Sequence, residues 1–408
     1  MDISNTFGVL VLKAGVFPIE RHRFPLYINK LHEGGIGPGE EVVAEFVAGK
    51  RTLPAITRVN SCLKFYFDIP NLISDIIRNK AIEQKRPLCR PFPFVFHIGS
   101  VRMRACLYKA AILWSKIKNA RIRDPYPAWP IDVSLSSLLH VAATQGISPL
   151  SMGIYAGPWP DGKKSVVCLS HDVDSYHGYL SIPKITAVEK RYHVKATYNI
   201  PGMRYKVDLA YLKRLEDEGF EFGIHGYKHT QSSPFLGAPE LTARLQRSLE
   251  RFRGLTITGY RSPALLRTKR LFEVLSQFLE YDSSVPDTEN FLHSRSVNNG
   301  CSIPFPYMVG TILEIPLTVP QDAVLLALAY SPEKILDCWL EKIAFLKKIG
   351  GVIVLNTHPD PPFLGNAAML DIYDRLLSGL ARDPELCCMT MGQLNTYVRG
   401  RMDAERKI

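Results

Sequence analysis

Residues 169–174 read LSHDVD and follow an uncharged apolar run, Val166 to Leu169, that is typical of a buried strand. A carboxylate at the end of such a strand needs a partner, because an unpaired charge away from water is costly or takes up a proton. Residues two apart on an extended strand point the same way, so Asp172 and Asp174 can face one site. A metal ion, a basic side chain or solvent could be the partner.

The segment HGYKH offers two metal ligands at a suitable spacing. His225 and His229 are four residues apart, which on a helical turn places both imidazoles on one face. An aspartate from another strand end would complete a two-histidine, one-carboxylate set, and a second carboxylate could act as general base on the water. By itself the histidine pair is equally typical of an ordinary surface or core turn, since the chain holds 11 histidines.

Two basic side chains also follow apolar runs. His358, in the segment NTHPD after Val352 to Leu355, could donate a proton to a leaving amine. Arg261, in the segment YRSP, could orient a base carboxylate through paired hydrogen bonds. Taken singly, a structural histidine and a surface arginine are the commoner interpretations of these two residues.

The elements that must position these segments begin near residue 165, where short apolar strands alternate with amphipathic helices, a pattern of parallel α/β units. The helix expected after Ser331 has Pro332 in its first turn and Gly350 at its end. Seven strands and their outer helices predict a barrel whose chemistry gathers at the carboxyl ends of the strands. The expected strands are VVCLS, ATYNI, EFGIHG, ITGYRS, FLEYDSS, TILEIPLTV and GVIVLNTH.

The segments LSHDVD, HGYKH, YRSP, YDSS and NTHPD, in this order, resemble the motifs of the polysaccharide deacetylases, carbohydrate esterase family 4. The resemblance covers about residues 160–400. It implies an α/β fold, a distorted (β/α)7-type barrel called the NodB homology domain. It also implies hydrolysis of an acetamide on a sugar with the help of a divalent metal, for which Zn²⁺ is the expected ion.

The resemblance assigns a role to each polar residue of the segments. It implies that Asp172 is the catalytic base, that Arg261 holds the base and that His358 is the general acid. Asp282 is the expected carboxylate that tunes this acid, with Asp287 as its competitor. The backbone N–H of Ala264 would bind the oxyanion. The implied metal ligands are Asp174, His225 and His229.

Two positions depart from the family pattern. Val173 separates two aspartates that commonly stand side by side, and Ala264 replaces an aromatic residue after Pro263. The alanine predicts that one wall of the substrate pocket is smaller or is built from another part of the chain.

The first 150 residues form a separate, basic region with 20 Lys and Arg residues against 11 Asp and Glu residues. We expect an α+β accessory domain at residues 1–150 and the deacetylase-like barrel at residues 151–408. Residues 84–123 hold ten basic residues and no acid, which would attract anionic lipid headgroups, phosphorylated substrates or nucleic acid. We expect a helix over 101–119. Arg102, Lys109, Lys116 and Arg123 recur every seven residues and form a basic stripe beside its apolar face. This stripe is either the solvated edge of an ordinary core-facing helix or a contact with a membrane surface or an anionic lipid-linked substrate.

The composition narrows the classes of protein. The chain of 408 residues is 46% apolar and has eight cysteines without a CxxC pair, which favours a large core with reduced thiols over a disulfide framework. With no bilayer-length apolar run and no signal-type start, we expect a cytoplasmic protein, at most peripheral at the inner membrane face.

The expected partner is an N-acylated carbohydrate, which could be linked to a lipid or a nucleotide. We expect no nucleic-acid partner. The alternatives are a deformylase of a lipid-linked amino sugar, a metal-free cyclic-amide hydrolase, and a catalytically silent glycan-binding protein.

Overall fold

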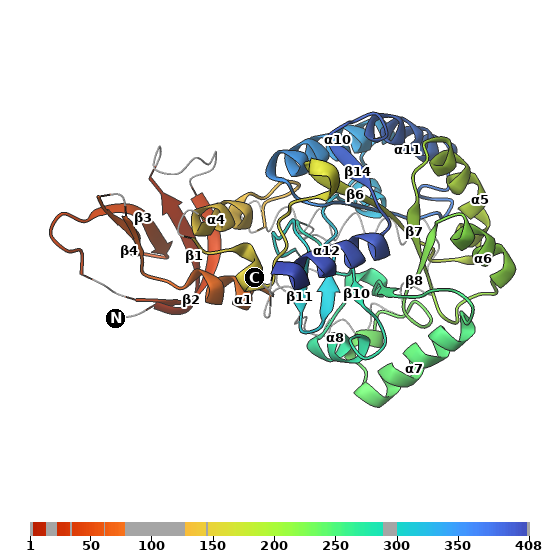
Figure 1. Cartoon of the computed structure of the whole chain (residues 1–408), viewed down its shortest axis with the longest axis horizontal. Helices are drawn as coiled ribbons and strands as arrows, with labels where there is room; N and C mark the ends of the chain where they lie inside the picture. Colours follow the sequence, from red (N-terminus) through yellow and green to blue (C-terminus); the bar gives the residue numbers. More distant parts are fainter. Residues whose placement is uncertain are drawn as a thin grey trace.

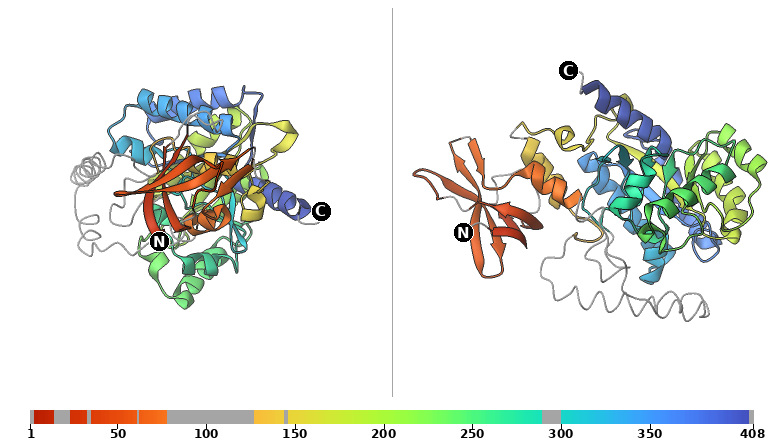
Figure 2. Two further views of the ribbon diagram at one scale, coloured as in Figure 1. Left: turned by 90° about the vertical axis from the view of Figure 1, so that its left-hand side faces the viewer. Right: turned by 90° about the horizontal axis from the view of Figure 1, so that it is seen from below.

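The residues that the structure describes form two sheets that share no strand (Figure 1). The computed structural model describes residues 3–13, 23–32, 35–60, 62–77, 127–143, 146–288 and 300–405. The right-hand view of Figure 2 shows the first sheet beside the larger α/β unit, and in the left-hand view the sheet lies in front of that unit. The helix predicted over 101–119, and with it the basic stripe, lies outside the described residues.

The first sheet is antiparallel and has the strand order β2-β1-β3-β4-β5. Its core includes Leu10, Phe46 and Ile56, all fully buried. Helices α1 and α4 lie between this sheet and the larger unit (Figure 1). The bounds are β1 Ile3–Leu12, β2 Arg23–Leu31, β3 Glu41–Ala48, β4 Arg51–Val59, β5 Cys62–Phe65, α1 Ile69–Ile76 and α4 Ser134–Ala143.

The second sheet has the order β11-β12-β10-β9-β8-β7-β6-β13, with β14 beside β6, and every pairing except that of β11 is parallel. An isolated parallel bridge between Val319 and Leu355 joins the segment after β12 to β13, so the two ends of the sheet meet. The fold is the distorted (β/α) barrel that the sequence predicted. The strands are β6 Ser165–Asp172, β7 Ala196–Ile200, β8 Glu221–Ile224, β9 Gly259–Tyr260, β10 Tyr281–Asp282, β11 Tyr307–Val309, β12 Ile312–Glu314, β13 Ile353–Thr357 and β14 Leu386–Cys388.

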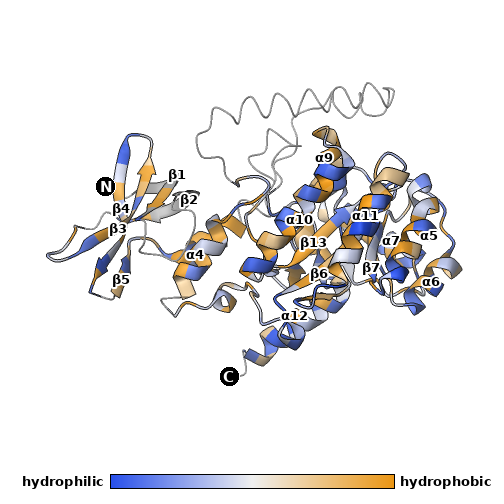
Figure 3. Ribbon diagram, turned by 90° about the horizontal axis from the view of Figure 1, so that it is seen from above, coloured by the Kyte–Doolittle hydropathy of each residue, from blue (hydrophilic) through white to orange (hydrophobic). Residues whose placement is uncertain are grey.

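Amphipathic helices cover the outside of the barrel, with apolar strands inside them (Figure 3). The predicted boundaries of α10 are confirmed: the Ser331 side chain caps the helix by accepting from the Lys334 N–H, and Gly350 ends it with a left-handed φ of 70°. Among the described residues no helix has both the length and the apolar character to cross a bilayer. The helices are α5 Tyr176–Arg191, α6 Leu209–Asp217, α7 Ala238–Arg251, α8 Lys269–Leu275, α9 Asp322–Ala327, α10 Pro332–Ile349, α11 Ala367–Leu380 and α12 Met391–Glu405.

Strand β6 lies between β7 and β13, and its last residues have partners on both sides. Asp172 pairs with Asn199 of β7, while His171 pairs with both Tyr198 of β7 and Thr357 of β13. Since all three strands are parallel, their carboxyl ends meet at one rim of the barrel. This rim holds the polar segments.

Candidate metal and catalytic site

Three of the predicted residues converge on one point. Asp174 Oδ1 lies 3.2 Å from His225 Nε2 and 2.9 Å from His229 Nε2. One ligand atom from each residue lies within 4.8 Å of the other two. Asp174 follows β6, whereas the histidines follow β8, and His229 takes a left-handed φ of 56° in the turn that brings it back beside His225. The rim therefore joins two loops about fifty residues apart in the sequence.

The chemistry of this donor set fits a divalent cation. His225 Nδ1 lies 3.0 Å from the Arg261 carbonyl oxygen, so it donates there and leaves Nε2 as an acceptor facing a carboxylate oxygen. Asp174 Oδ1 is buried and accepts no hydrogen bond from the described residues. A carboxylate oxygen and an imidazole nitrogen 3.2 Å apart need a proton or a cation between them. Ligands about 2.0–2.2 Å from a zinc ion lie at comparable separations from one another.

Asp172 is the second carboxylate of the segment, and two amide side chains hold it. Its Oδ1 accepts from Asn199 Nδ2 at 3.0 Å, and its Oδ2 accepts from Asn356 Nδ2 at 2.8 Å. Burial opposes its ionisation, but His225, Arg261 and His358 hold the pKa of Asp172 below its usual value. The side chain is thus an oriented, ionised carboxylate beside the three candidate ligands.

Asp174 is ionised for a similar reason. Burial again acts against the charge, and the close imidazoles of His229 and His225 bring the pKa of Asp174 well below its usual value. The site therefore offers one carboxylate that could hold a cation and a second one, two residues earlier at the end of β6, that could accept a proton.

Arg261 lies beside Asp172 but does not make the paired hydrogen bonds that the sequence suggested. Its Nη1 is 3.6 Å from Asp172 Oδ1, an ion pair without a hydrogen bond. Its Nη2 donates to Ser170 Oγ at 3.2 Å and to Ser283 Oγ at 3.0 Å. The arginine is fully buried, so it contributes charge, while Asn199 and Asn356 orient the carboxylate.

His358 has a carboxylate partner, and that partner is Asp322. His358 Nδ1 lies 2.7 Å from Asp322 Oδ1, and the His358 backbone N–H donates to Asp322 Oδ2 at 2.9 Å. Burial disfavours the charged ring, but Asp322, followed by Asp174 and Asp172, raises the pKa of His358 to about 10. A protonated imidazole with Nδ1 occupied by a carboxylate can donate a proton only from Nε2.

Asp282 and Asp287, the carboxylates expected beside His358, lie elsewhere. Asp282 is hydrogen-bonded to Ser284 and Glu314. Asp287 forms a buried ion pair with Lys342, with Asp287 Oδ2 2.6 Å from the Lys342 Nζ. The segment YDSS thus builds the wall under the site, because β10 stands three strands away from β7 along the sheet. The motif order did not predict this displacement.

Ala264 has the backbone geometry of a special position. It lies in the 3-10 helix Pro263–Leu265 with a left-handed φ of 53°, uncommon for a residue with a side chain. This turn packs closely on the HGYKH segment, since a Cβ on Gly226 would come within 2.7 Å of Pro263 Cγ. The contact ties the YRSP turn to the loop of the two histidines.

Sequence reasoning missed Asp322, Asn199 and Asn356. Both asparagines stand at strand ends, in the segments ATYNI and NTHPD, so their position was a usable signal. Asp322 opens α9 after the strand that contains Glu314, beyond the part of that segment marked as a strand. The bridge between Val319 and Leu355 and the hydrogen bond from Asn356 Nδ2 to Gln321 Oε1 bring it beside His358.

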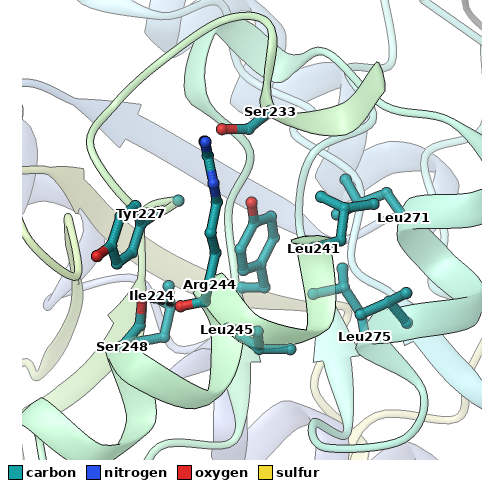
Figure 4. A pocket seen from close by; sticks show the side chains of 12 residues that line it. Ile224, Tyr227, Ser233, Leu241, Arg244, Leu245, Ser248, Leu271 and Leu275 are labelled. Carbon is teal, nitrogen blue, oxygen red and sulfur yellow. Dashed lines mark hydrogen bonds between the residues drawn. The ribbon is translucent and has the colours of Figure 1, made fainter. Parts of the chain in front are cut away.

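An apolar hollow lies on the outer side of the HGYKH segment, between that segment and helices α7 and α8. Figure 4 shows Leu241, Leu245 and Leu275 on one side of it and Tyr227 on the other, with Arg244 reaching toward Ser233. None of the three candidate metal ligands lines it. The hollow is separate from the polar rim.

Comparisons with known proteins agree with the motifs. Residues 160–278 match the family described as Polysaccharide deacetylase. Peptidoglycan deacetylase of Helicobacter pylori (strain ATCC 700392 / 26695) is 32% identical over 91 residues, which are 22% of this chain and 31% of that protein. The match thus spans about a third of the curated relative.

One solved structure, from Mycobacterium smegmatis and described as a polysaccharide deacetylase, has the same fold. It is 20% identical, covers 60% of this chain and 93% of its own, and superposes with a TM-score of 0.51. The barrel is therefore of the NodB type. The matched residues include the segments LSHDVD, HGYKH and YRSP, in agreement with the resemblance to the polysaccharide deacetylases, whereas YDSS and NTHPD lie beyond them. The discussed residues from Asp282 onward, among them Asp322, Asn356 and His358, lie beyond the matched segment 160–278.

Proposed function

We propose that the protein is a divalent-metal-dependent hydrolase that removes the N-acetyl group from a sugar of a polysaccharide or glycolipid precursor. The observation that carries the proposal is the convergence of Asp174, His225 and His229 on one point, with Asp172 and His358 beside it. These three residues would hold the ion, with Zn²⁺ as the expected metal. A bound cation supplies polarisation of the amide carbonyl and lowers the pKa of a water molecule.

The remaining chemistry belongs to side chains of the chain itself. Asp172, kept ionised by its neighbours, accepts a proton from the attacking water. His358, kept protonated by Asp322, donates its Nε2 proton to the nitrogen as the C–N bond breaks, which leaves an amine and acetate. We assign the oxyanion contact to the backbone N–H of Ala264, whose left-handed turn is tied to the histidine loop.

Metal content and acyl release together test this function. Purified full-length protein should contain about one divalent ion per chain and release acetate from an N-acetylated sugar panel that includes peptidoglycan. Asp174→Asn should lose the ion and the activity. Asp371→Asn, which removes an exposed carboxylate on α11, is the matched control and should retain both.

Each alternative has its own outcome. Amide hydrolysis without a bound ion, indifferent to chelators, would identify a metal-free amide hydrolase. Release of formate from an N-formylated amino sugar, with no acetate released from the N-acetylated panel, would identify a deformylase. An ion-containing protein that binds glycans but releases no acyl group would be a silent binding protein.

We further propose that the basic segment 84–123 holds an anionic carrier of the substrate at the inner, cytoplasmic face of the membrane. The support is its ten positive charges without an acid. Flotation with liposomes of phosphatidylcholine and phosphatidylglycerol should recover the protein, and Lys109→Glu with Lys116→Glu should reduce recovery. If the double variant is recovered with the liposomes as well as the parent is, the segment does not hold an anionic carrier at the membrane.

A further inference from the structure

An aromatic surface adjoins the candidate metal site. Tyr176, the first residue of α5, stands two positions after Asp174 and is 48% exposed. Its ring stacks on that of the buried Tyr179, with centroids 6.1 Å apart and planes 20° apart. Leu180, one turn further along α5, is 56% exposed. A large aromatic ring left in water beside a catalytic rim requires an explanation.

The tyrosines beneath this surface are fixed in place. The Tyr179 hydroxyl accepts from the Asp208 N–H at 2.9 Å. The Tyr205 ring contacts both other rings, at 6.3 Å from Tyr176 and 6.0 Å from Tyr179. The Tyr205 hydroxyl donates to the carbonyl oxygen of Val173, which separates the two catalytic aspartates. The aromatic surface is thus tied to the segment that carries the chemistry.

The same surface continues toward the histidine loop. Of the seven large hydrophobic side chains that are exposed among the described residues, four lie on α5, on the β7–α6 loop or at the start of α6: Tyr176, Leu180, Met203 and Leu209. The loop between β7 and α6 is bonded to the HGYKH segment, because the Gly202 N–H donates to Gly226 O at 2.8 Å and the Met203 N–H to Tyr227 O at 2.6 Å. The patch therefore borders both loops that supply candidate metal ligands.

We propose that Tyr176, with Leu180, Met203 and Leu209, forms a saccharide subsite that binds the sugar ring next to the one whose acetamide reacts. The proposal rests on the proposed function. One face of a pyranose ring presents axial C–H groups that pack on an aromatic ring, while its hydroxyls remain at the edge in water. The exposed Arg204 and Lys206 on the same loop give the patch a polar border that suits a hydroxylated ligand. The substrate is accordingly an oligosaccharide or polysaccharide chain.

The test compares a chain with a single sugar. The probes are N-acetylglucosamine, penta-N-acetylchitopentaose and a soluble peptidoglycan strand, measured with full-length protein by calorimetry for Kd and by acetate release for KM and kcat. Tyr176→Ala should raise Kd and KM for a bound chain about tenfold and affect the monosaccharide far less. Tyr176→Phe should keep most of the affinity. Leu340→Ala, which removes a side chain of similar exposure on α10, is the control.

The outcomes separate this inference from the proposed function. Tyr176-dependent binding without acetate release would retain the subsite and overturn the hydrolase. Acetate release with the same KM and Kd in Tyr176→Ala would retain the hydrolase and overturn the subsite. No binding of either glycan chain would also overturn the subsite, as would Tyr176-dependent binding of phosphatidylglycerol vesicles in place of glycans.

Discussion

Two acidic pairs lie buried at the same rim of the barrel, and they are in opposite states. Asp172 and Asp174 have lowered pKa values, whereas burial raises the pKa of Asp282 and, to a greater extent, that of Glu314. All except Asp174 are nearly inaccessible as whole residues. Burial alone therefore does not decide whether such a carboxyl group is charged.

The difference comes from the neighbouring side chains. Asp172 and Asp174 face two imidazoles, and Arg261 adds a guanidinium 3.6 Å from Asp172. Asp282 and Glu314 are register partners on β10 and β12, and their side chains are hydrogen-bonded to each other. Two carboxylates in contact do not both ionise, so this pair retains a proton. The first pair is equipped for catalysis, and the second serves as a neutral wall.

Asp172→Asn should have the largest effect of the substitutions in the two acidic pairs, because asparagine has nearly the same shape as aspartate but cannot ionise and act as a base. We expect kcat to fall by about 10³-fold. The bound ion and the far-ultraviolet circular dichroism should be those of the parent, since the three candidate ligands are untouched. A variant that retains full activity would show that Asp172 is not the base.

Asp322→Asn should have the next largest effect, because it removes the carboxylate that charges His358. The raised pKa of His358, about 10 against an ordinary 6.5, keeps the ring protonated at neutral pH. Activity that needs this proton is lost as the pH rises through that pKa. The variant should therefore lose its activity at a lower pH than the parent does, and its kcat at neutral pH should be lower than that of the parent. A pH–kcat profile and histidine NMR titration measure the shift. If the fall of kcat on the alkaline side of the profile occurs at the same pH in the parent and in Asp322→Asn, Asp322 does not set the pKa of His358.

The same residue gives a stability prediction of known sign. A histidine whose folded pKa is raised contributes stability that is complete below its unfolded pKa and is lost as the pH rises toward the folded value. Urea unfolding of the parent should therefore weaken between about pH 7 and 10 more than that of Asp322→Asn.

Glu314→Gln should have the smallest effect, since glutamine resembles a carboxyl group that is already protonated. The free energy of unfolding should change by less than about 1 kcal/mol at pH 7, with activity retained. A carboxyl group whose folded pKa is raised contributes stability that is complete below its unfolded pKa of about 4.5 and is lost as the pH rises toward the folded value, so the variant should lose less stability than the parent as the pH rises above about 4.5. A large loss of stability at pH 7 would show that Glu314 is charged.

The sequence predicted the barrel strands and the ligand cluster because these depend on local patterns. Strand ends are visible as apolar runs followed by polar residues, and parallel strands bring such ends together. This rule was sufficient to predict that His225, His229 and Asp174 lie close together. Asp322 was missed because its position depends on how the sheet closes, which no local pattern encodes.

The same reasoning explains the error at Asp282. The order of motifs along the chain gives the order of strands, but it does not tell which side chain crosses to His358. Asp282 lies at a strand end as expected. Its side chain is engaged by Ser284 and Glu314, a partner that lies on the next strand of the sheet.

The hydrogen bonds from Asn199 and Asn356 that orient Asp172 depend on how the barrel folds. Asn356 and Asp172 are 184 positions apart, and their hydrogen bond exists only when the first and last strands of the barrel are side by side. Contacts of such long range form late and cooperatively in slow-folding topologies. A nascent chain in which β6 and β13 have not yet paired therefore lacks the Asn356 contact that orients Asp172.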